Sequence, residues 1–338
     1  MKEYELVFLG VRGGSMKAAV IIPTLNESEH IEGLLSAVCQ QIPDVISDIV
    51  VTDGGSTDGT VELVNRVSAR DSRVRLIHNP SKIQSAGINL AVGTLASDVD
   101  AFVRLDAHSG YDPNYLSTVL DALRENNAQS VVVRLKTVGH SCLQKSISAC
   151  MNSVLGTGGS IHRTGGVSQF VDHGHHAGFD RESFVAAGGY DETFVANEDA
   201  EFDARLTAGR GRIWFEADAE VDYFPRSTLG ALAKQYFRYG KGRVMTWRKS
   251  GNPLRLRQMI PAVLAASIFG SLVFAVVAPV FFAFVVLYLL GCLAGAIWLT
   301  IKSKNLCALL AVFALPTIHV SFGTGFILEF ANGASSGR

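Results

Sequence analysis

The feature that most constrains this chain is a long run without charged side chains in its C-terminal third. Residues 258–301 form 44 consecutive positions that contain no Asp, Glu, Lys or Arg. A helix that crosses a membrane needs about 20 apolar residues. The run therefore predicts two membrane-spanning helices with a turn near Ala278-Pro279, and its length disfavours a soluble core helix. A third uncharged run, residues 305–328, contains Pro316 and is a weaker candidate for a span.

The charges are divided unevenly along the chain, although the formal net charge is only −1. Residues 1–222 carry 18 Lys/Arg and 30 Asp/Glu, whereas residues 223–328 contain no acidic residue and residues 226–257 hold nine Lys/Arg. Because the basic residues lie outside the acidic body of the chain, the pattern does not indicate nucleic-acid binding. It is typical of a domain held at an anionic membrane surface. If the first two spans form a hairpin, the basic segment and Lys302 would both be cytoplasmic.

The sequence divides into four expected parts. They are an N-terminal extension (1–16), an α/β domain (17–225), basic interfacial helices (226–258) and a membrane region with two to three spans (259–330). The first 15 residues are too short and too acidic to match a secretory signal. The five cysteines form no CxxC pair, so we expect a reducing compartment in which they serve as small apolar residues.

Strands and helices alternate over the first 110 residues or so. "AAVIIP" predicts a buried strand, followed by a helix over 26–41 with Asn26 as its N-cap, and "DIVVTDGGSTDGTVELVNRVSAR" repeats the pattern. This alternation predicts an α/β fold with a mostly parallel sheet flanked by helices. Ligands bind beyond the carboxyl ends of such strands. We therefore expect convergence of the polar segments that follow three strands: Pro23–Glu27, Asp53–Ser56 and Asp106–His108.

The stretch "VVTDGGSTDGT" admits two interpretations. Asp53 can accept hydrogen bonds from a nucleotide base or ribose, while Gly54 and Gly55 allow close approach of the backbone. The alternative is an ordinary strand-to-helix turn, capped by one of residues 56–58. The stretch is not GxGxxG, so it does not imply a dinucleotide fold.

Four motifs, "VIIPTLNE", "VVTDGGSTDGT", "RLDAHS" and "ANEDAEFDARLTAGRGRIWF", occur in this order within residues 17–250. Together they resemble the inverting glycosyltransferase family 2, with the GT-A (nucleotide-diphospho-sugar transferase) fold. They are most similar to bacterial succinoglycan-type exopolysaccharide β-glucosyltransferases. The resemblance implies a UDP-sugar donor, UDP-glucose above all, a divalent metal, and a hydroxyl acceptor.

The resemblance also implies roles for individual residues. Asp53 would contact uracil or ribose, and Asp106 would lie at the nucleotide diphosphate. The other residues expected to line the nucleotide site are Pro23, Thr24, Asn26, Glu27, Lys82, Ser85 and Ala86.

Asp106 corresponds to the first acid of the DxD motif of the family, and His108 stands where a second acid is usual. A carboxylate and an imidazole two residues apart on a strand lie on the same side. Both can bind Mn²⁺ or Mg²⁺, and imidazole shifts the preference toward Mn²⁺. A DxH motif also occurs in manganese-binding N-acetylgalactosaminyltransferases that modify peptides. The alternative is that His108 caps a turn and Asp106 is the only protein ligand.

Three histidines lie close together at His173, His175 and His176, but no cysteine or acid completes a zinc site at the usual spacing. Two interpretations remain open. One of His175 and His176 supplies a third metal ligand or binds the donor diphosphate, or both shape the acceptor pocket.

Four acidic residues open a helix in "NEDAEFD". The helix dipole alone explains acidic residues at this end, and we expect Glu201 and Asp203 to have only that role, with Glu201 on the solvated face. By the resemblance, Asp199 is the general base that takes the acceptor proton, and Glu198 orients it or binds the acceptor. An inverting transfer needs one such base and a metal at the leaving diphosphate.

The segment "KQYFRYGKGR" resembles the (Q/R)xxRW element of processive synthases, with Tyr239 in place of Trp. Gln235 and Arg238, three residues apart, would share a helix face and could hold acceptor sugar or diphosphate. A basic helix lying on lipid headgroups accounts for the same residues.

The features together predict an enzyme that transfers one glucose from UDP-glucose to a polyprenyl-diphosphate-linked oligosaccharide in exopolysaccharide biosynthesis. It would act at the bacterial inner membrane, with the catalytic domain on the cytoplasmic side. A processive synthase is one alternative, but an export channel needs more spans. A non-catalytic membrane scaffold is the other, and the intact Asp53, Asp106 and Asp199 disfavour it.

Overall fold

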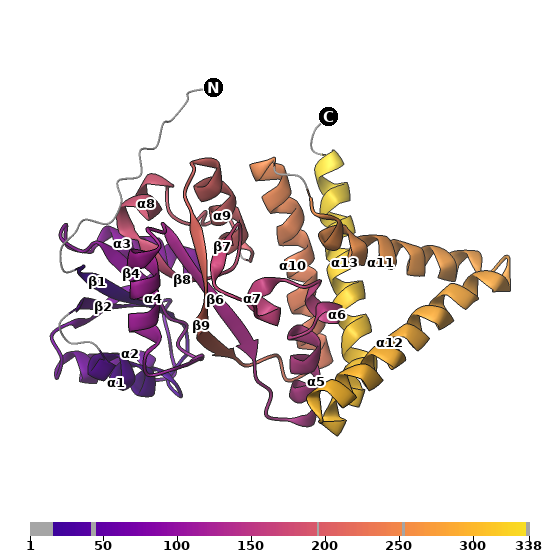
Figure 1. Ribbon diagram of the computed structural model, residues 1–338, viewed down its shortest axis with the longest axis horizontal. Helices are drawn as coiled ribbons and strands as arrows, with labels where there is room; N and C mark the ends of the chain where they lie inside the picture. The colour runs from indigo at the N-terminus through magenta and orange to yellow at the C-terminus, as the bar shows by residue number, and fades with distance from the viewer. Residues whose placement is uncertain (1–15, 42–44, 195, 252–253, 336–338) are drawn as a thin grey trace. The chain divides into compact units, whose positions relative to one another are not determined.

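The computed structural model describes residues 16–335 apart from 42–44, 195 and 252–253 (Figure 1). Of the expected N-terminal extension, only Met16 is therefore described. The chain forms two compact units, the first built from residues 1–135 and 165–222, the second from 136–164 and 223–338. The sequence predicted a boundary near residue 225 but did not predict that the segment 136–164 belongs with the C-terminal helices.

The first unit begins with the predicted parallel sheet. Its strands lie in the order β3-β2-β1-β4, all parallel. They are β1 (Ala18–Thr24), β2 (Ile46–Asp53), β3 (Val74–His78) and β4 (Ala101–Arg104). The connecting helices are α1 (Ile31–Gln41), α2 (Thr60–Ser68) and α3 (Gln84–Gly93). The prediction of alternating strands and helices is confirmed here.

Beyond β4 the sheet becomes antiparallel, so the expectation of a mostly parallel sheet holds for the first four strands only. Strand β8 (His175–Asp180) runs antiparallel to β4 and to β6 (Ser130–Thr137). Strand β9 (Ile213–Tyr223) follows β6 in the sheet and pairs antiparallel with β5 (Gly110–Tyr111) and β7 (Gln169–Val171). Three further helices belong to this unit: α4 (Tyr115–Glu125), α8 (Arg181–Ala186) and α9 (Glu198–Ala208).

The core of the first unit explains why these strands form. Residues 18–22 of β1 are fully buried, as expected for a strand in a parallel sheet that is covered on both faces. An aromatic group joins β4, β8 and α8, because Phe102 stacks on Phe179 with ring centroids 4.8 Å apart and meets Phe184 edge-on at 5.0 Å. This packing holds β4 against β8 at the strand ends opposite to those that carry the candidate site residues.

The second unit is helical. Its elements are α5 (Cys142–Met151), α6 (Val154–Thr157), α7 (Ile161–Thr164), α10 (Leu229–Ser250), α11 (Leu256–Phe274), η1 (Pro279–Phe281), α12 (Phe282–Ser303), η2 (Leu306–Leu310) and α13 (Ala311–Ser335). Three helical segments, Leu256–Phe274, Pro279–Ser303 and Leu306–Asn332, are long and apolar enough to cross a membrane. The chain turns between Phe274 and Pro279, which confirms the predicted turn.

Helices α10 and α13 lie side by side in this unit, and glycines bring their backbones together (Figure 1). A Cβ atom on Gly240 would overlap the carbonyl of Phe322, and one on Gly325 would overlap the carbonyl of Phe237. Small residues allow the same close approach between helices in membranes. By contrast, Val276 at the tip joining α11 and α12 is 88% exposed, which suits contact with lipid rather than water.

The expectation that the cysteines serve as small apolar residues is wrong for two of them. Cys142, the first residue of α5, forms a disulfide with Cys307 of η2, 165 residues away. The three remaining cysteines, Cys39, Cys150 and Cys292, are free. The sequence contained no local signal for the pair, because its two members meet only when α5 packs against η2.

Candidate active site

Hydrogen bonds tie together the loops that follow β1 and β2. The backbone N–H of Asn26 donates to Ser56 Oγ at 2.8 Å, and the N–H of Thr57 donates to Asn26 Oδ1 at 2.9 Å. Asn26 has a left-handed backbone (φ 58°), and α1 begins only at Ile31. The prediction that Asn26 is the N-cap of α1 is therefore wrong. Asn26 instead links two loops of the site.

Asp53 ends β2 and shapes the loop that follows it. Its side chain is buried, and Oδ2 accepts hydrogen bonds from the N–H groups of Gly55 (2.7 Å) and Ser56 (2.9 Å). Thr24, at the end of β1, lies with its hydroxyl 3.5 Å from Asp53 Oδ1. Lys82 approaches the same loop, since its ammonium would be 3.9 Å from a Cβ on Gly55. The contacts of the Asp53 carboxylate are thus those of a strand-to-helix turn.

The residues expected in "QSAG" divide into buried and accessible ones. Ser85 and Ala86 are buried in the first turn of α3, and Ser85 Oγ has no partner in the described part of the chain. Their side chains are therefore not accessible to a ligand in this structure. Gln84 is the residue whose side chain reaches the site, donating from Nε2 to Asp106 Oδ1 at 2.7 Å. The sequence did not single it out.

Asp106 and His108 follow β4, but each side chain has its own protein partner. Asp106 Oδ1 accepts the hydrogen bond from Gln84 Nε2 and lies 3.3 Å from Arg104 Nε. His108 Nδ1 lies 2.8 Å from Glu27 Oε1, and the imidazole side chain is 49% exposed. Among the described residues, no group of three or more His, Cys, Asp or Glu side chains is arranged so that it could hold a metal ion. A carboxylate and an imidazole suit Mn²⁺ or Mg²⁺ if diphosphate oxygens and water complete the coordination.

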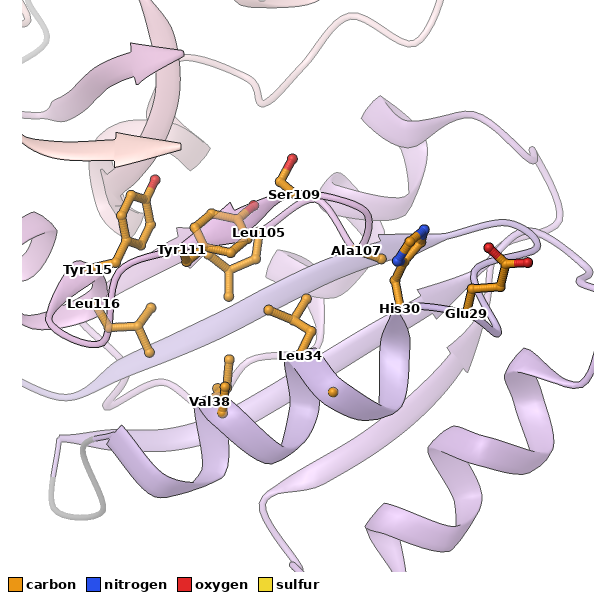
Figure 2. A pocket seen from close by; sticks show the side chains of 12 residues that line it. Glu29, His30, Leu34, Val38, Leu105, Ala107, Ser109, Tyr111, Tyr115 and Leu116 are labelled. Atoms are coloured by element: carbon orange, nitrogen blue, oxygen red, sulfur yellow. The ribbon is translucent and has the colours of Figure 1, made fainter. Parts of the chain in front are cut away.

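A cavity of about 310 Å³ lies beneath the loop that carries these two residues (Figure 2). Leu34 and Val38 of α1 form one wall, and Ala107 and Tyr111 belong to the loop itself. The hydroxyl of Tyr111 accepts the backbone N–H of Asp106 at 2.6 Å. The loop therefore has mainly apolar free space on one side, and Tyr111 holds its backbone at Asp106.

Arg104, the last residue of β4, connects Asp106 to the acidic start of α9. Its buried guanidinium places Nη1 3.1 Å from Asp199 Oδ1 and 3.7 Å from Glu198 Oε1. One cation thus contacts both the metal-ligand candidate and the base candidate. Arg104 is not among the site residues predicted from the sequence, although a charged residue that ends an apolar strand is itself a signal, since a buried charge needs partners.

His176 on β8 is the second buried group beside Asp199. Its Nδ1 lies 2.5 Å from Tyr190 Oη and 3.3 Å from Asp199 Oδ1, and its Nε2 lies 2.7 Å from Asp203 Oδ1. His173 holds the other oxygen of Asp203, with Nδ1 2.8 Å from Oδ2. These contacts account for His173 and His176 as carboxylate partners within the protein.

His175 is the second histidine beside Asp199. Its Nδ1 is 3.8 Å from Asp199 Oδ2, and its side chain is 14% exposed whereas that of His176 is fully buried. Of these two histidines, His175 is therefore the one more accessible to a ligand at Asp199.

The expectation for the next acidic residues of α9 is wrong. Glu201 is 1% exposed rather than solvated, and both its oxygens lie 2.7 Å from Arg205. Asp203 is equally buried. The helix turns this face inward because Arg205 and His176 supply charges that compensate the buried carboxylates.

Glu198 and Asp199, the two carboxylates that open α9, have pKa values that their buried surroundings shift in opposite directions. Burial opposes ionisation of Asp199, but His176 and Arg104 together bring its pKa well below the usual range. Burial and the neighbouring Asp199 charge raise the pKa of Glu198 to about 7, and Arg104 opposes them. For His176, burial favours the neutral ring, yet Asp203 and Asp199 raise its pKa to about 10. Two adjacent carboxylates with separated pKa values are a pattern of acid–base sites.

In the second unit, Gln235 and Arg238 lie in different environments although both belong to α10. Gln235 is buried and donates from Nε2 to the hydroxyls of Tyr223 (2.7 Å) and Tyr239 (2.9 Å). Arg238 is exposed. Within the motif, Gln235 is thus hydrogen-bonded to Tyr239, the residue that replaces Trp.

The fold and the site define the class of protein. An α/β sheet that starts with four parallel strands carries an Asp-x-His pair after β4 and a carboxylate pair at the start of α9. This arrangement is that of a glycosyltransferase with a GT-A-like fold.

Comparisons with known proteins agree with this class. The family model for glycosyl transferase family 2 matches residues 19–186. The succinoglycan biosynthesis protein ExoA of Rhizobium meliloti is 40% identical over 315 residues, which cover 93% of this chain and 95% of that protein. The chain therefore belongs to glycosyl transferase family 2.

More distant relatives share parts of the chain or its fold. The glycosyltransferase AglE of Haloferax volcanii is 26% identical over 244 residues, 68% of this chain and 73% of that protein. The solved structure of the mannosyltransferase PcManGT from Pyrobaculum calidifontis, in complex with GDP-Man and Mn²⁺, superposes with a TM-score of 0.59. It covers 94% of this chain and 87% of that one at 17% identity, and so shows the common fold.

Proposed function

We propose that this glycosyltransferase transfers a single glucose from UDP-glucose to a polyprenyl-diphosphate-linked oligosaccharide, with inversion, in exopolysaccharide biosynthesis. The observation that carries the proposal is the position of Asp199, held by Arg104 and His176 and joined through Arg104 to Asp106. The name of the Rhizobium meliloti relative, a succinoglycan biosynthesis protein, supports the polysaccharide context. The apolar helices support a lipid-linked acceptor at the bacterial inner membrane, with the catalytic unit on the cytoplasmic side.

The donor would be held by the loops after β1, β2 and β4. Pro23, Thr24, Asn26 and Glu27 line the first loop, Asp53 fixes the second, and Lys82 brings a positive charge to it. A divalent cation, Mn²⁺ or Mg²⁺, held by Asp106 and His108 would neutralise charge on the leaving diphosphate. His108 would leave Glu27 and turn toward the diphosphate, because its ring is exposed on a short loop.

Asp199 is the proposed general base. As the acceptor hydroxyl oxygen attacks the anomeric carbon, its proton passes to Asp199 and the bond to the nucleoside diphosphate breaks on the opposite face. Arg104 and His176 hold one oxygen, Oδ1, and leave Oδ2 toward His175. His175 would then orient the acceptor, and Glu198 would position Asp199 through Arg104.

The test is an assay of the purified full-length protein in detergent. UDP release from UDP-glucose should require both a divalent cation and a lipid-linked oligosaccharide acceptor. UDP-galactose and GDP-mannose serve as comparison donors, and preference for either would contradict the donor assignment. Products longer by many sugars would favour a processive synthase, and the absence of transfer with any donor would favour a non-catalytic scaffold.

A further inference from the structure

A buried arginine in the second unit has no acidic partner. Arg163, in α7, is 9% exposed, and its Nη1 donates to Thr137 Oγ1 at 3.3 Å. Its guanidinium carbon lies 5.2 Å from the ring centre of Tyr223. No carboxylate of the described residues forms an ion pair with it. A mostly buried guanidinium without a carboxylate partner binds an anion strongly, so we expect the working protein to bring an anion to this position.

Tyr223 connects Arg163 to the side-chain amide of Gln235, whose oxygen lacks a hydrogen-bond donor. Tyr223 Oη accepts from Gln235 Nε2 at 2.7 Å, and Tyr239 Oη accepts from the same nitrogen at 2.9 Å. Gln235 Oε1 is buried and has no donor in the described structure. The cluster formed by Arg163, Thr137, Tyr223, Gln235 and Tyr239 therefore lacks both an anionic acceptor and a hydrogen-bond donor.

The free donors of Arg163 are within reach of a ligand. A guanidinium has five N–H donors, and the only described hydrogen bond, to Thr137, engages Nη1. No nitrogen of Arg163 is among the fully buried, unpartnered polar atoms of the described residues. The remaining donors therefore face accessible space, while the floor of the cluster is rigid, because the amide of Asn152 holds the backbone of Thr137 on both sides.

We propose that this cluster binds the sugar-phosphate end of the lipid-linked acceptor. Phosphate oxygens would accept from the Arg163 guanidinium, and a sugar hydroxyl would donate to Gln235 Oε1 once this enclosed side chain rotates toward the ligand. Tyr223 and Tyr239 supply apolar ring surface for a sugar. Arg–phosphate pairs are strong when bidentate, and the apolar core beside Tyr236 and Leu232 strengthens them further.

The inference rests on the proposed function for the source of the phosphate. A donor diphosphate has the same chemistry, but the residues proposed for the donor all lie in the first unit, whereas the Arg163 cluster lies in the second, with the three apolar helices. We therefore assign the site to the acceptor, and the experiment separates the two sources.

Titration calorimetry of the full-length protein in detergent tests the site with three probes: farnesyl diphosphate, farnesyl diphosphoglucose, and UDP with Mn²⁺. Arg163→Met should weaken both farnesyl probes about 10- to 100-fold, the loss of one or two charge-assisted hydrogen bonds. Arg163→Lys should fall between Met and wild type, because lysine keeps the charge but lacks the fork. Gln235→Leu should weaken only the glucose-bearing probe. Lys145→Gln, which removes an exposed positive charge of the same unit, should match wild type throughout.

Other outcomes of the calorimetry would contradict either the site or the proposed function. If Arg163→Met binds the farnesyl probes like wild type, the site is wrong even if the enzyme uses a lipid acceptor. If it loses UDP affinity instead, Arg163 serves the donor. If wild type binds neither farnesyl probe, the lipid-linked acceptor of the proposed function is wrong as well. Arg163→Met should keep or raise the melting temperature, and a large fall with intact binding would give Arg163 a purely structural role.

Discussion

The Nε2 atom of His176 lies 2.7 Å from Oδ1 of Asp203, and both side chains are completely shielded from water. The opposite ring nitrogen faces Tyr190 and Asp199, so the ring stands between two carboxylates of the same helix. A protonated ring compensates both acids at once. The relationship explains how α9 can turn Asp203 inward while it keeps Asp199 at the site, and it makes the stability of the first unit depend on one proton.

Replacement of His176 by Gln should therefore destabilise the protein. Breaking a buried ion pair by removing one partner typically costs about 3–5 kcal/mol. The pKa of His176 is raised from 6.5 to about 10, so its contribution is fully present below pH 6.5 and is lost as the pH rises toward 10. Thermal unfolding measured from pH 6 to pH 10 should show this loss in wild type and a flatter profile in His176→Gln.

The control for this experiment is a substitution outside the pair. His140→Gln leaves the carboxylates untouched, because His140 belongs to the second unit, and it should keep the wild-type slope between pH 6.5 and pH 10. An unchanged slope in His176→Gln would show that the ring is neutral in the folded protein.

Glu201 gives a second test of the inward face of α9. Glu201→Gln removes a buried carboxylate that binds Arg205 through both oxygens, so it should lower the free energy of unfolding by about 3 kcal/mol. Transfer activity measured well below the melting temperature should change little, since the Glu201 carboxylate is held by Arg205 on the buried face of α9. A large fall in kcat with unchanged stability would place Glu201 in the catalytic machinery.

His108 should decide the choice of metal. If it is a ligand, His108→Ala should raise the Mn²⁺ concentration needed for half-maximal activity at least tenfold, because one of two protein ligands is lost. His108→Asp should retain activity and shift the preference toward Mg²⁺, which favours oxygen ligands. The measurement is UDP release over a titration of each cation, with direct metal binding followed by calorimetry. Wild-type activity of His108→Ala at low Mn²⁺ would leave His108 as a partner of Glu27 only.

How far the sequence predicts this molecule depends on whether the signal is local. Local composition alone predicts β1 and β4, which are apolar runs, and α11 and α12, which form one uncharged run. These elements follow the prediction closely. Arg104 and Asp203 could not be assigned in the same way. Their partners are 95 and 27 residues away, and the contacts exist only because β8 packs between β4 and β6 and α9 turns one face inward. The disulfide of Cys142 with Cys307 depends on packing in the same manner.

The two carboxylates that open α9, Asp199 and Glu198, should respond differently to substitution. Asp199→Asn keeps the shape of the side chain but cannot accept a proton, and a positioned base contributes typically 10²–10⁴-fold. We expect a loss of about that size in kcat with little change in UDP affinity, because Asp199 contacts His175 and His176 rather than the loops proposed for the donor.

Glu198→Gln should behave differently, and its pH dependence is the discriminating observation. The pKa of Glu198 is raised to about 7, so wild type carries a protonated Glu198 below that pH and an ionised one above it. Glutamine imitates the protonated form. The variant should therefore match wild type at pH 6, and if ionised Glu198 helps to position Asp199 through Arg104, it should fall behind at pH 8. If instead Glu198→Gln abolishes transfer across the whole pH range while Asp199→Asn remains active, Glu198 is the base. Asp199 then serves to hold Arg104 and His176 in place.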